Sequence, residues 1–222
     1  MTAGTIDLIT VAREFGAGGS ELATALGRRL GWRVLDRDLI DRVAERLRME
    51  PGAVEAIDEH PPHYLARVAA ALHVAPPEAP MFVETRDLLS PDAVANAAGD
   101  VVREAAREPP VVIVGHGGQC ILHDRPMALH VRLVAPIERR AERLCARGAC
   151  DPRSAGASIR RMDDARHAYI RRYHNADWRD PLLYDMQLNT GRVSIAEAVE
   201  LVLAVVRARG GHSLGVQAAV GD

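Results

Sequence analysis

The sequence contains no lysine. All 28 of its basic residues are arginines, set against 30 acidic residues and a formal net charge of −2. Mechanisms that depend on a lysine, such as a Schiff base or the phosphate-binding lysine of an ordinary nucleotide-binding loop, are therefore excluded. The arginines are interspersed with acids along the chain, so the one-signed field that nucleic-acid binding uses is missing. We expect no nucleic-acid partner.

Aromatic residues and cysteines are also scarce. Aromatics make up only 4% of the chain, so the core must be aliphatic and base-stacking platforms are not expected. The three cysteines, Cys120, Cys145 and Cys150, form no disulfide framework, as is typical of a reducing compartment. No run approaches the roughly 18 apolar residues of a membrane span, and the N-terminus lacks a signal-peptide pattern. We expect a cytoplasmic protein without a membrane partner, as a monomer or a homodimer.

What is present is an alternation of strand and helix patterns. The 222 residues suit a single domain over residues 1–210, followed by a flexible tail over 211–222. Strands are expected over 6–11, 33–35, 111–114, 130–134 and 186–188, and helices over 21–30, 36–47, 90–107, 137–147, 154–174 and 195–207. This order predicts an α/β fold: a parallel sheet of about five strands with helices on both faces. The proline-rich stretch 49–110 predicts a helical insert.

A glycine-rich turn follows the first expected strand, where residues 13–20 read REFGAGGS. Such a turn lets backbone N–H groups converge on an anion at the positive end of a helix dipole. Against the phosphate-loop pattern G-x-x-x-x-G-K-[ST], the segment keeps Gly18 and Ser20 but has Arg13 for the first glycine and Gly19 for the lysine. By pattern alone, a tight structural turn explains the segment equally well.

If the turn does hold phosphates, its parts have definite roles. Arg13 is the local candidate for the charge that the lysine would bring, and the Ser20 hydroxyl is the candidate ligand of Mg²⁺. The candidate phosphate-binding residues are Gly16, Ala17, Gly18, Gly19 and Ser20. Residues 36–42 and 115–118 also follow expected strands, and ligands of parallel α/β folds bind at the carboxyl ends of strands. One crevice could therefore collect all three segments.

Taken together, these segments resemble the cytidylate kinase-like family, a branch of the P-loop nucleoside monophosphate kinases. The resemblance covers most of the chain. It is carried by ITVAREFGAGGSELATALGRRLG with VLDRDLIDR, by VVIVGHGGQCIL, by LHVRLVAPIERRAERL and by DPLLYDMQLNTGRVS. It implies a P-loop kinase-like sheet with a helical insert on the acceptor side, an arginine-rich helical lid over residues 150–178, and ATP and Mg²⁺ as cofactors.

The resemblance also implies substrate-binding residues. Cytidylate kinases carry, after the second strand, an aspartate and, six residues later, an arginine that contacts the nucleoside monophosphate. Asp36 and Arg42 stand at this spacing. After the third strand the family has Gly-Arg, whereas this chain has Gly115 and His116. His116 is a shorter and only partly charged donor for the acceptor phosphate.

In family kinases an arginine-bearing lid closes over the transferring phosphoryl group, because planar guanidinium donors stabilise its charge. The candidate catalytic arginines of the lid are Arg161, Arg166 and Arg172. The alternative for any one of them is a solvated helix whose arginines pair with Asp163 and Asp164.

The leading hypothesis is therefore a kinase-like enzyme that moves the γ-phosphoryl group of Mg-ATP to a pyrimidine nucleoside monophosphate, with CMP or dCMP implied by the resemblance. Two alternatives stay open. The missing lysine and His116 would suit a P-loop module that only binds or senses a nucleotide or another phosphorylated ligand. The insert names no ligand, so a kinase for another small phosphorylated acceptor is the third reading.

Overall fold

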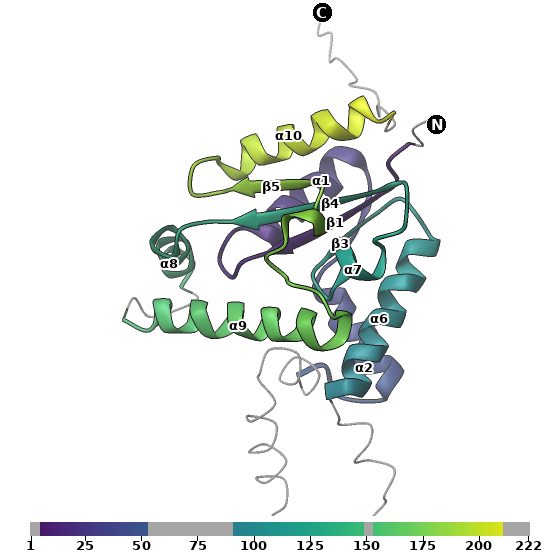
Figure 1. Ribbon diagram of the computed structural model, residues 1–222, viewed down its shortest axis with the longest axis horizontal. Coiled ribbons are helices and arrows are strands. Elements are labelled where there is room, and N and C mark those ends of the chain that lie inside the picture. Colours follow the sequence, from purple (N-terminus) through teal and green to yellow (C-terminus); the bar gives the residue numbers. More distant parts are fainter. Residues whose placement is uncertain (1–4, 53–90, 149–152, 211–222) are drawn as a thin grey trace, which may run out of the picture.

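A five-stranded parallel sheet forms the centre of the molecule (Figure 1). The computed structural model describes residues 5–52, 91–148 and 153–210. The strands are β1 (Leu8–Arg13), β2 (Arg33–Leu35), β3 (Val111–Val114), β4 (Ala128–Val134) and β5 (Met186–Asn189), in the order β2-β3-β1-β4-β5. Every neighbouring pair is parallel, which confirms the expected α/β sheet.

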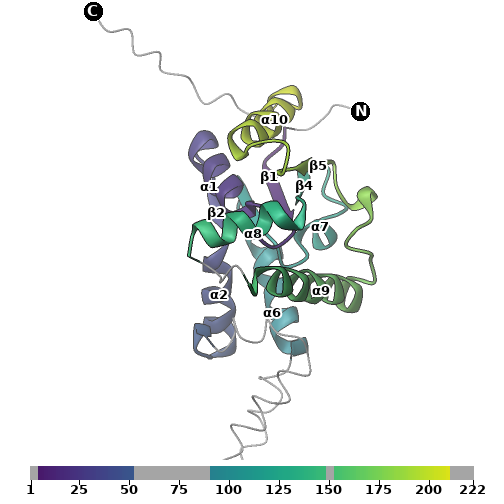
Figure 2. The same cartoon turned by 90° about the vertical axis from the view of Figure 1, so that its left-hand side faces the viewer.

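Helices cover both faces of this sheet, as Figure 2 shows in side view. Helices α1 (Gly19–Leu30) and α10 (Ile195–Ala208) share one apolar cluster, and α2 (Arg37–Leu47) and α6 (Pro91–Arg107) share the other. Strand β3 supplies both clusters, because successive side chains of a strand point to opposite faces. Val112 and Val114 join the first cluster, and Val111 and Ile113 join the second. An all-aliphatic β-branched strand is thus buried on both sides.

The remaining helices lie near the ends of strands. They are the short α7 (Gly118–Ile121), α8 (Ile137–Ala146), the long α9 (Ala155–His174) and a 3₁₀ turn η1 (Pro181–Leu183). Helix α9 buries only Ala155, Ile159 and Ile170, which agrees with its polar sequence. It packs against α8 and runs alongside the sheet (Figure 1). A helix this polar is placed by polar contacts rather than by a hydrophobic face.

Most element bounds lie within two residues of those expected from sequence. Strand β4 begins at Ala128, two residues before the expected start, and α10 ends at Ala208. Helix α6 runs from Pro91 to Arg107 as predicted. Parts of the expected insert (53–90), of the lid region (149–152) and of the tail (211–222) lie outside the described residues. None of the described helices has the length and apolarity needed to cross a bilayer.

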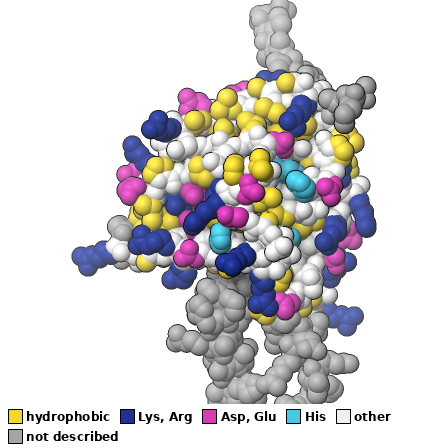
Figure 3. Space-filling view, viewed as in Figure 1, with side chains coloured by type: hydrophobic (Ala, Val, Ile, Leu, Met, Phe, Trp, Pro, Cys, Tyr) yellow, Lys and Arg dark blue, Asp and Glu magenta, His cyan; other side chains and the backbone are white. Residues whose placement is uncertain are grey.

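The surface carries charges of both signs in close proximity. Figure 3 shows cationic and acidic side chains interspersed over the face that it presents. Several are exposed ion pairs, such as Arg29 with Glu200 and Arg139 with Glu142. This pattern matches the mixed charge order read from the sequence.

Candidate active site

Strands β1 and β3 end side by side, and their following loops form the candidate site. Val11 is paired with Val114 in the sheet, and the Gly115 N–H donates to the Val11 carbonyl at 3.1 Å. The glycine-rich turn after β1 and the Gly115–Gly118 turn after β3 are therefore neighbours at the carboxyl edge. This is the edge where parallel α/β sheets bind ligands.

The carbonyl groups of the glycine-rich turn are held from one side. Arg140 Nη1 donates to the Phe15 carbonyl at 3.2 Å, and Arg143 Nη1 donates to the Gly16 carbonyl at 2.8 Å. The Thr190 hydroxyl donates to the Ala17 carbonyl at 2.8 Å. In a trans peptide the N–H points away from the carbonyl of the preceding residue. Fixing these carbonyls therefore turns the N–H groups of Gly16 and Gly18 away from the residues that hold the loop, whereas the Ala17 N–H donates to the Glu14 carbonyl within the turn at 3.0 Å.

The turn leads directly into α1 through left-handed backbone. Gly16 has φ +80° and Gly18 has φ +92°, a region that side chains rarely adopt. The first backbone hydrogen bond of α1 runs from the Leu22 N–H to the Gly18 carbonyl at 3.0 Å. The N–H groups of residues 19–21 precede it, and such first-turn groups have no partner within the helix. They form, with the helix dipole, a site suited to an anion.

Two oxygen donors at this helix start are suited to Mg²⁺. Ser20 is exposed, and the neighbouring Glu21 has a buried oxygen, Oε2, that no described residue hydrogen-bonds. The described part of the chain gathers no set of three or more acidic, histidine or cysteine ligands. Mg²⁺ in kinase sites is commonly held by one or two protein oxygens together with water and substrate phosphates. The donors present are compatible with this arrangement.

Arg13 lies across the position where the loop pattern has its lysine. A Cβ added at Gly19 would come within 2.6 Å of Arg13 Cγ, and a Cβ at Gly115 would overlap Arg13 Nη1. Nη2 is 4.0 Å from Asp36 Oδ1, and the two side chains are 19% and 25% exposed. The structure thus brings Arg13, Asp36, Gly19 and Gly115 together, from segments far apart in the sequence. Small residues at 19 and 115 are required for this path of the arginine side chain.

Helix α9 is attached to the glycine-rich turn by two of its side chains. Asp163 Oδ1 accepts the Phe15 N–H at 2.8 Å, and its Oδ2 lies 2.5 Å from Arg140 Nη1. Arg166 Nη1 donates to the Arg13 carbonyl at 2.8 Å, and its guanidinium lies 5.6 Å from the centre of the Phe15 ring. These two contacts therefore hold the arginine-rich helix against the glycine-rich turn.

A cavity of about 100 Å³ lies between the two turns and α9. Two predicted arginines and the predicted histidine line it: Arg13, Arg166 and His116. Its wall also contains Gln119, Tyr169 and Trp178, together with apolar side chains of α9. Cationic groups therefore converge on one small space at the carboxyl edge. Such a space is suited to a phosphate group.

Three predicted site residues lie elsewhere. Arg42 lines an open hollow between α2 and α6, beside Asp38 and Glu45, and does not line the cavity. Arg161 is exposed and does not line the cavity either. Arg172 pairs with Asp92 of α6 at 2.9 Å. The structure therefore unites Arg13, Asp36, His116 and Arg166, but not the three other arginines.

Several residues around the cavity were not singled out by the sequence as site residues. Gln119 is one of them; its position in the turn after β3 was the available signal. Trp178 is another; it is 4% exposed and lines the cavity. The buried Arg132 guanidinium lies 5.0 Å from the centre of the Trp178 ring and 5.5 Å from that of Tyr184. This stacking fixes one wall of the cavity.

Burial alters the acidity of groups that support the site. It lowers the pKa of Arg143, which donates to Gly16 and also to the Thr190 carbonyl at 3.2 Å. It raises the pKa of the Cys120 thiol to about 11, so the thiol next to Gln119 stays protonated and unreactive. Burial also lowers the pKa of His174, with repulsion from Arg103 as the second cause. The histidine at the end of α9 is therefore kept neutral at neutral pH.

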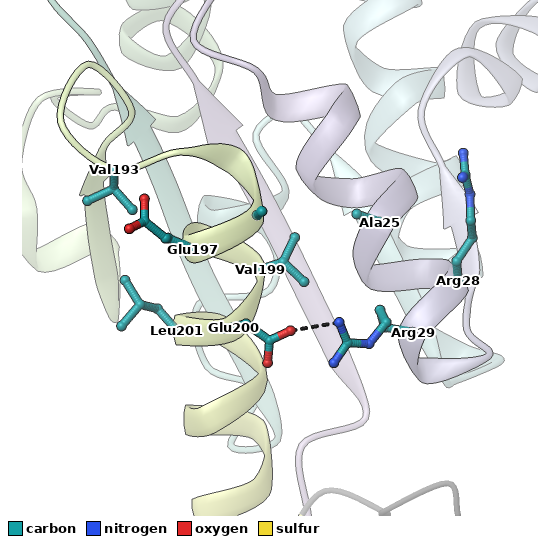
Figure 4. Close-up of a pocket in the computed structure, with 9 residues that line it drawn as sticks. Ala25, Arg28, Arg29, Val193, Glu197, Val199, Glu200 and Leu201 are labelled. Atoms are coloured by element: carbon teal, nitrogen blue, oxygen red, sulfur yellow. Dashed lines mark hydrogen bonds and ion pairs between the residues drawn. The ribbon is translucent and has the colours of Figure 1, made fainter. Parts of the chain in front are cut away.

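A larger hollow, of about 890 Å³, lies between α1 and α10. Figure 4 shows it lined by apolar side chains such as Val199 and Leu201, with the Arg29–Glu200 ion pair across it. It is open and contains few converging polar groups. The smaller cavity is therefore the better candidate, because charge and hydrogen-bond donors converge there.

Comparison with known proteins identifies the class. The cytidylate kinase-like family matches residues 8–192, which include β1, the glycine-rich turn, both neighbouring loops and α9. The chain therefore belongs to the cytidylate kinase-like family. No curated protein matches the chain significantly.

Solved structures show the same fold. An uncharacterized protein from Eubacterium ventriosum superposes with a TM-score of 0.65 at 20% identity, over 90% of this chain and 98% of that chain. Shikimate kinase from Acinetobacter baumannii, in complex with shikimate, gives a TM-score of 0.53 at 15% identity, over 93% of this chain and 96% of that one. The protein TT1252 from Thermus thermophilus gives 0.53 at 22% identity, over 94% and 100%. These likenesses establish a P-loop kinase fold.

Proposed function

We propose that this protein transfers the γ-phosphoryl group of Mg-ATP to a pyrimidine nucleoside monophosphate, CMP or dCMP. Membership of the cytidylate kinase-like family supports phosphoryl transfer, and the solved shikimate kinase shows that this fold serves kinases of small molecules. The observation that carries the proposal is Arg13. Its side chain passes over Gly19, the lysine position of the loop pattern, and is oriented by Asp36. Arg13 therefore supplies the positive charge that a lysine at position 19 would carry.

The chain's own groups divide the work of the reaction. The amides of Gly16 and of residues 18–20 hold phosphate oxygens, while Arg13 and Arg166 stabilise the charge that spreads over the transferring group. His116 binds the acceptor phosphate, and Ser20 holds Mg²⁺. When bound, the ion neutralises charge on the β- and γ-phosphate oxygens. We also propose that residues 1–210 act as a single domain, with a helical insert over residues 49–110 and a lid over residues 150–178.

The chemical step needs no general base. An anionic oxygen of the acceptor phosphate forms a bond to the γ-phosphorus, and the bond from that phosphorus to the bridging oxygen of ATP breaks. ADP leaves with the electron pair of the broken bond, and the acceptor becomes a diphosphate. Positioning and charge stabilisation are then the main requirements of catalysis, and the loop and the arginines meet them.

The lid must move during this cycle. A cavity of about 100 Å³ holds a phosphate-sized group, whereas pockets for whole ligands of drug size are about 300 Å³ or more. Asp163 and Arg166 hold α9 on the glycine-rich turn in the present state. Entry of a nucleotide requires α9 to shift. Arg161 and Arg172, which lie outside the cavity, would join the clamp only through such a movement.

Phosphoryl transfer from Mg-ATP to a panel of all ribo- and deoxyribonucleoside monophosphates tests the proposal, with the diphosphate product detected by chromatography and mass spectrometry. We expect CDP or dCDP as the dominant product. Protein that is folded and binds ATP, yet yields no diphosphate with any acceptor, would contradict the proposal. Product from a purine monophosphate alone would contradict the acceptor class and leave the reaction type standing.

A second function, nucleotide binding without transfer, is favoured by one observation. The Asp163 carboxylate accepts the Phe15 N–H at the start of the glycine-rich turn, so an acidic side chain of the protein lies directly beside the expected phosphate site. Such a module would bind ATP or another phosphorylated ligand and leave it intact. ATP binding measured by calorimetry, together with the absence of ADP after long incubation, would identify this function.

A further inference from the structure

Gln119 carries an almost fully buried amide that no described residue hydrogen-bonds. It is 2% exposed, lies on the short α7 after β3, and lines the cavity. No described residue hydrogen-bonds its side chain, and its amide atoms keep a little exposure, which the cavity provides. Buried amides are normally hydrogen-bonded, because removal from water without a partner is unfavourable. A group kept in this state in a cavity wall is explained by a ligand that completes its bonds.

The position of Gln119 suits recognition of the part of the acceptor that carries no charge. The other polar groups of the wall include Arg13, Arg166 and His116, which are suited to the phosphate. An amide is neutral and has both a donor and an acceptor, so it reads neutral hydrogen-bonding groups rather than anions. Two aromatic side chains, Tyr169 and Trp178, line the same cavity.

We propose that Gln119 is a specificity-determining residue that hydrogen-bonds a neutral polar group of the phosphorylated acceptor, either on the base or on the sugar. This inference rests on the proposed function, since it assumes a phosphorylated acceptor in this cavity. In this role, Gln119 distinguishes phosphorylated acceptors by the base or the sugar that they carry. A site that hydrogen-bonds a substrate group discriminates strongly against analogues that lack it, because its own polar atoms are then left unpaired.

The proposal makes an unusual prediction for stability. Gln119→Met keeps the approximate volume and removes the unpaired amide, so we expect the unliganded protein to melt about 2 °C higher or more. Gln187→Met is the matched control, because it removes an exposed amide outside the cavity. Its Oε1 accepts from Arg132 Nη1 at 3.0 Å. The control should melt at the same or a lower temperature than the wild type and bind ligands unchanged.

Binding measurements test the proposed role of Gln119 directly. Calorimetry with CMP, ribose 5-phosphate and inorganic phosphate is carried out on the wild type and on both variants. We expect Gln119→Met to weaken CMP binding by about five- to tenfold and to leave inorganic phosphate within twofold. Ribose 5-phosphate weakened to the same extent assigns the amide to the sugar, and ribose 5-phosphate unchanged assigns it to the base. Gln119→Glu, which replaces the donor NH₂ with a second oxygen, should also weaken CMP binding.

The possible failures are distinguishable. If the wild type binds CMP and Gln119→Met binds it equally well, the role of Gln119 is overturned while the proposed function stands. An equal loss for CMP and inorganic phosphate would mean a general disturbance of the cavity and would also overturn the role. If the folded wild type binds no nucleoside monophosphate, the proposed function fails, and the role of Gln119 that rests on it fails too.

Discussion

The middle and the end of α9 use the same residue types in different ways. In the middle, Asp163 and Arg166 contact the glycine-rich turn in partly buried surroundings. At the end, Arg172 and Tyr173 both bond to Asp92 of α6, where the ion pair is 54% and 56% exposed. A charge contact gains strength where water is excluded and loses most of it at the surface. The middle of α9 therefore controls the site, and the end serves as a surface attachment.

The end of α9 has its own local electrostatics. Burial and the Asp92 carboxylate raise the pKa of Tyr173 to about 12, so its hydroxyl remains a donor at any physiological pH. The same hydroxyl is the main cause of the lowered pKa of Asp92. This contact holds α9 near α6 without taking part in the cavity. The comparison between the two parts can be tested by substitutions in each.

Loss of Arg13 should have the largest effect. We expect Arg13→Gly to reduce kcat for phosphoryl transfer by roughly 10²- to 10³-fold, because a preorganised charge for the transition state is removed. Steady-state kinetics with Mg-ATP and CMP measure it, and circular dichroism checks folding. Activity close to that of the wild type would remove Arg13 from the mechanism.

A double variant sharpens this test. Arg13→Gly with Gly19→Lys restores the full pattern G-x-x-x-x-G-K-S and should recover at least tenfold of the lost activity. Gly19→Lys alone should not gain activity, because its Cβ would come within 2.6 Å of Arg13 Cγ. Equal activity of Arg13→Gly and of the double variant would show that a lysine at position 19 does not replace Arg13.

Breaking the contact in the middle of α9 should cost stability. Asp163→Ala leaves Arg140, which is 7% exposed, without its shortest ion pair and leaves the Phe15 N–H unbonded. We expect the free energy of unfolding to fall by about 2 kcal/mol, measured by urea denaturation. Glu142→Ala breaks an exposed ion pair with Arg139 on α8, the helix that also carries Arg140. This substitution should change the free energy of unfolding by less than about 0.5 kcal/mol. Similar losses in the two variants would contradict the difference in burial.

The two arginines of the comparison should differ in catalysis. Arg166→Ala should lower kcat/KM by roughly tenfold or more, since its guanidinium lines the cavity. Arg172→Ala should lower it by less than about threefold, because the side chain is exposed and pairs with Asp92. Both variants are measured with Mg-ATP and CMP. A larger loss for Arg172 would mean that the closed lid brings a different face of α9 to the phosphates.

The smallest expected effect is a pH dependence from His174. Its Nε2 is buried without a partner among the described residues, and burial lowers its pKa below 6.5. The unfolded chain therefore binds the proton more readily, and stability present above about pH 6.5 is lost as the pH falls through that value. Melting temperatures between pH 7.5 and 5.0 should fall less steeply for His174→Gln than for the wild type. The exposed His123→Gln serves as control and should follow the wild type.

The sequence predicted the layers better than the site. Alternating apolar strands and capped helices indicate a parallel α/β sheet without any tertiary information, and α6 lies where its Ser-Pro start and Pro-Pro end place it. The glycine-rich turn and His116 were found for the same reason, since they directly follow strands. Arg42 and Arg161 were not placed in the cavity. A side chain's direction depends on which face of its helix packs inward, and spacing alone does not give that.

Helix α9 illustrates the limit. At 100° per residue, Arg161 and Arg172 share one face of the helix, and Arg166 lies about 120° away. Both faces are polar, so no hydrophobic stripe indicates which one meets the loop. Contacts of Asp163 with Phe15 and Arg140 settle it. These partners are more than 20 residues distant in sequence and become neighbours only in the folded chain.

By itself, the sequence determined the fold class, the missing lysine and the place of the phosphate-binding turn, because these depend on local periodicity and on residue types. Only the tertiary structure decided how the missing charge is supplied: Arg13 reaches over Gly19 and Gly115, and Asp36 orients it. Only the tertiary structure showed that the buried Gln119 lines the same cavity as Arg13 and Arg166. Both features lie where loops from separate strands come together. The distances between residues of such loops are fixed by packing of the whole sheet rather than by neighbours in the chain.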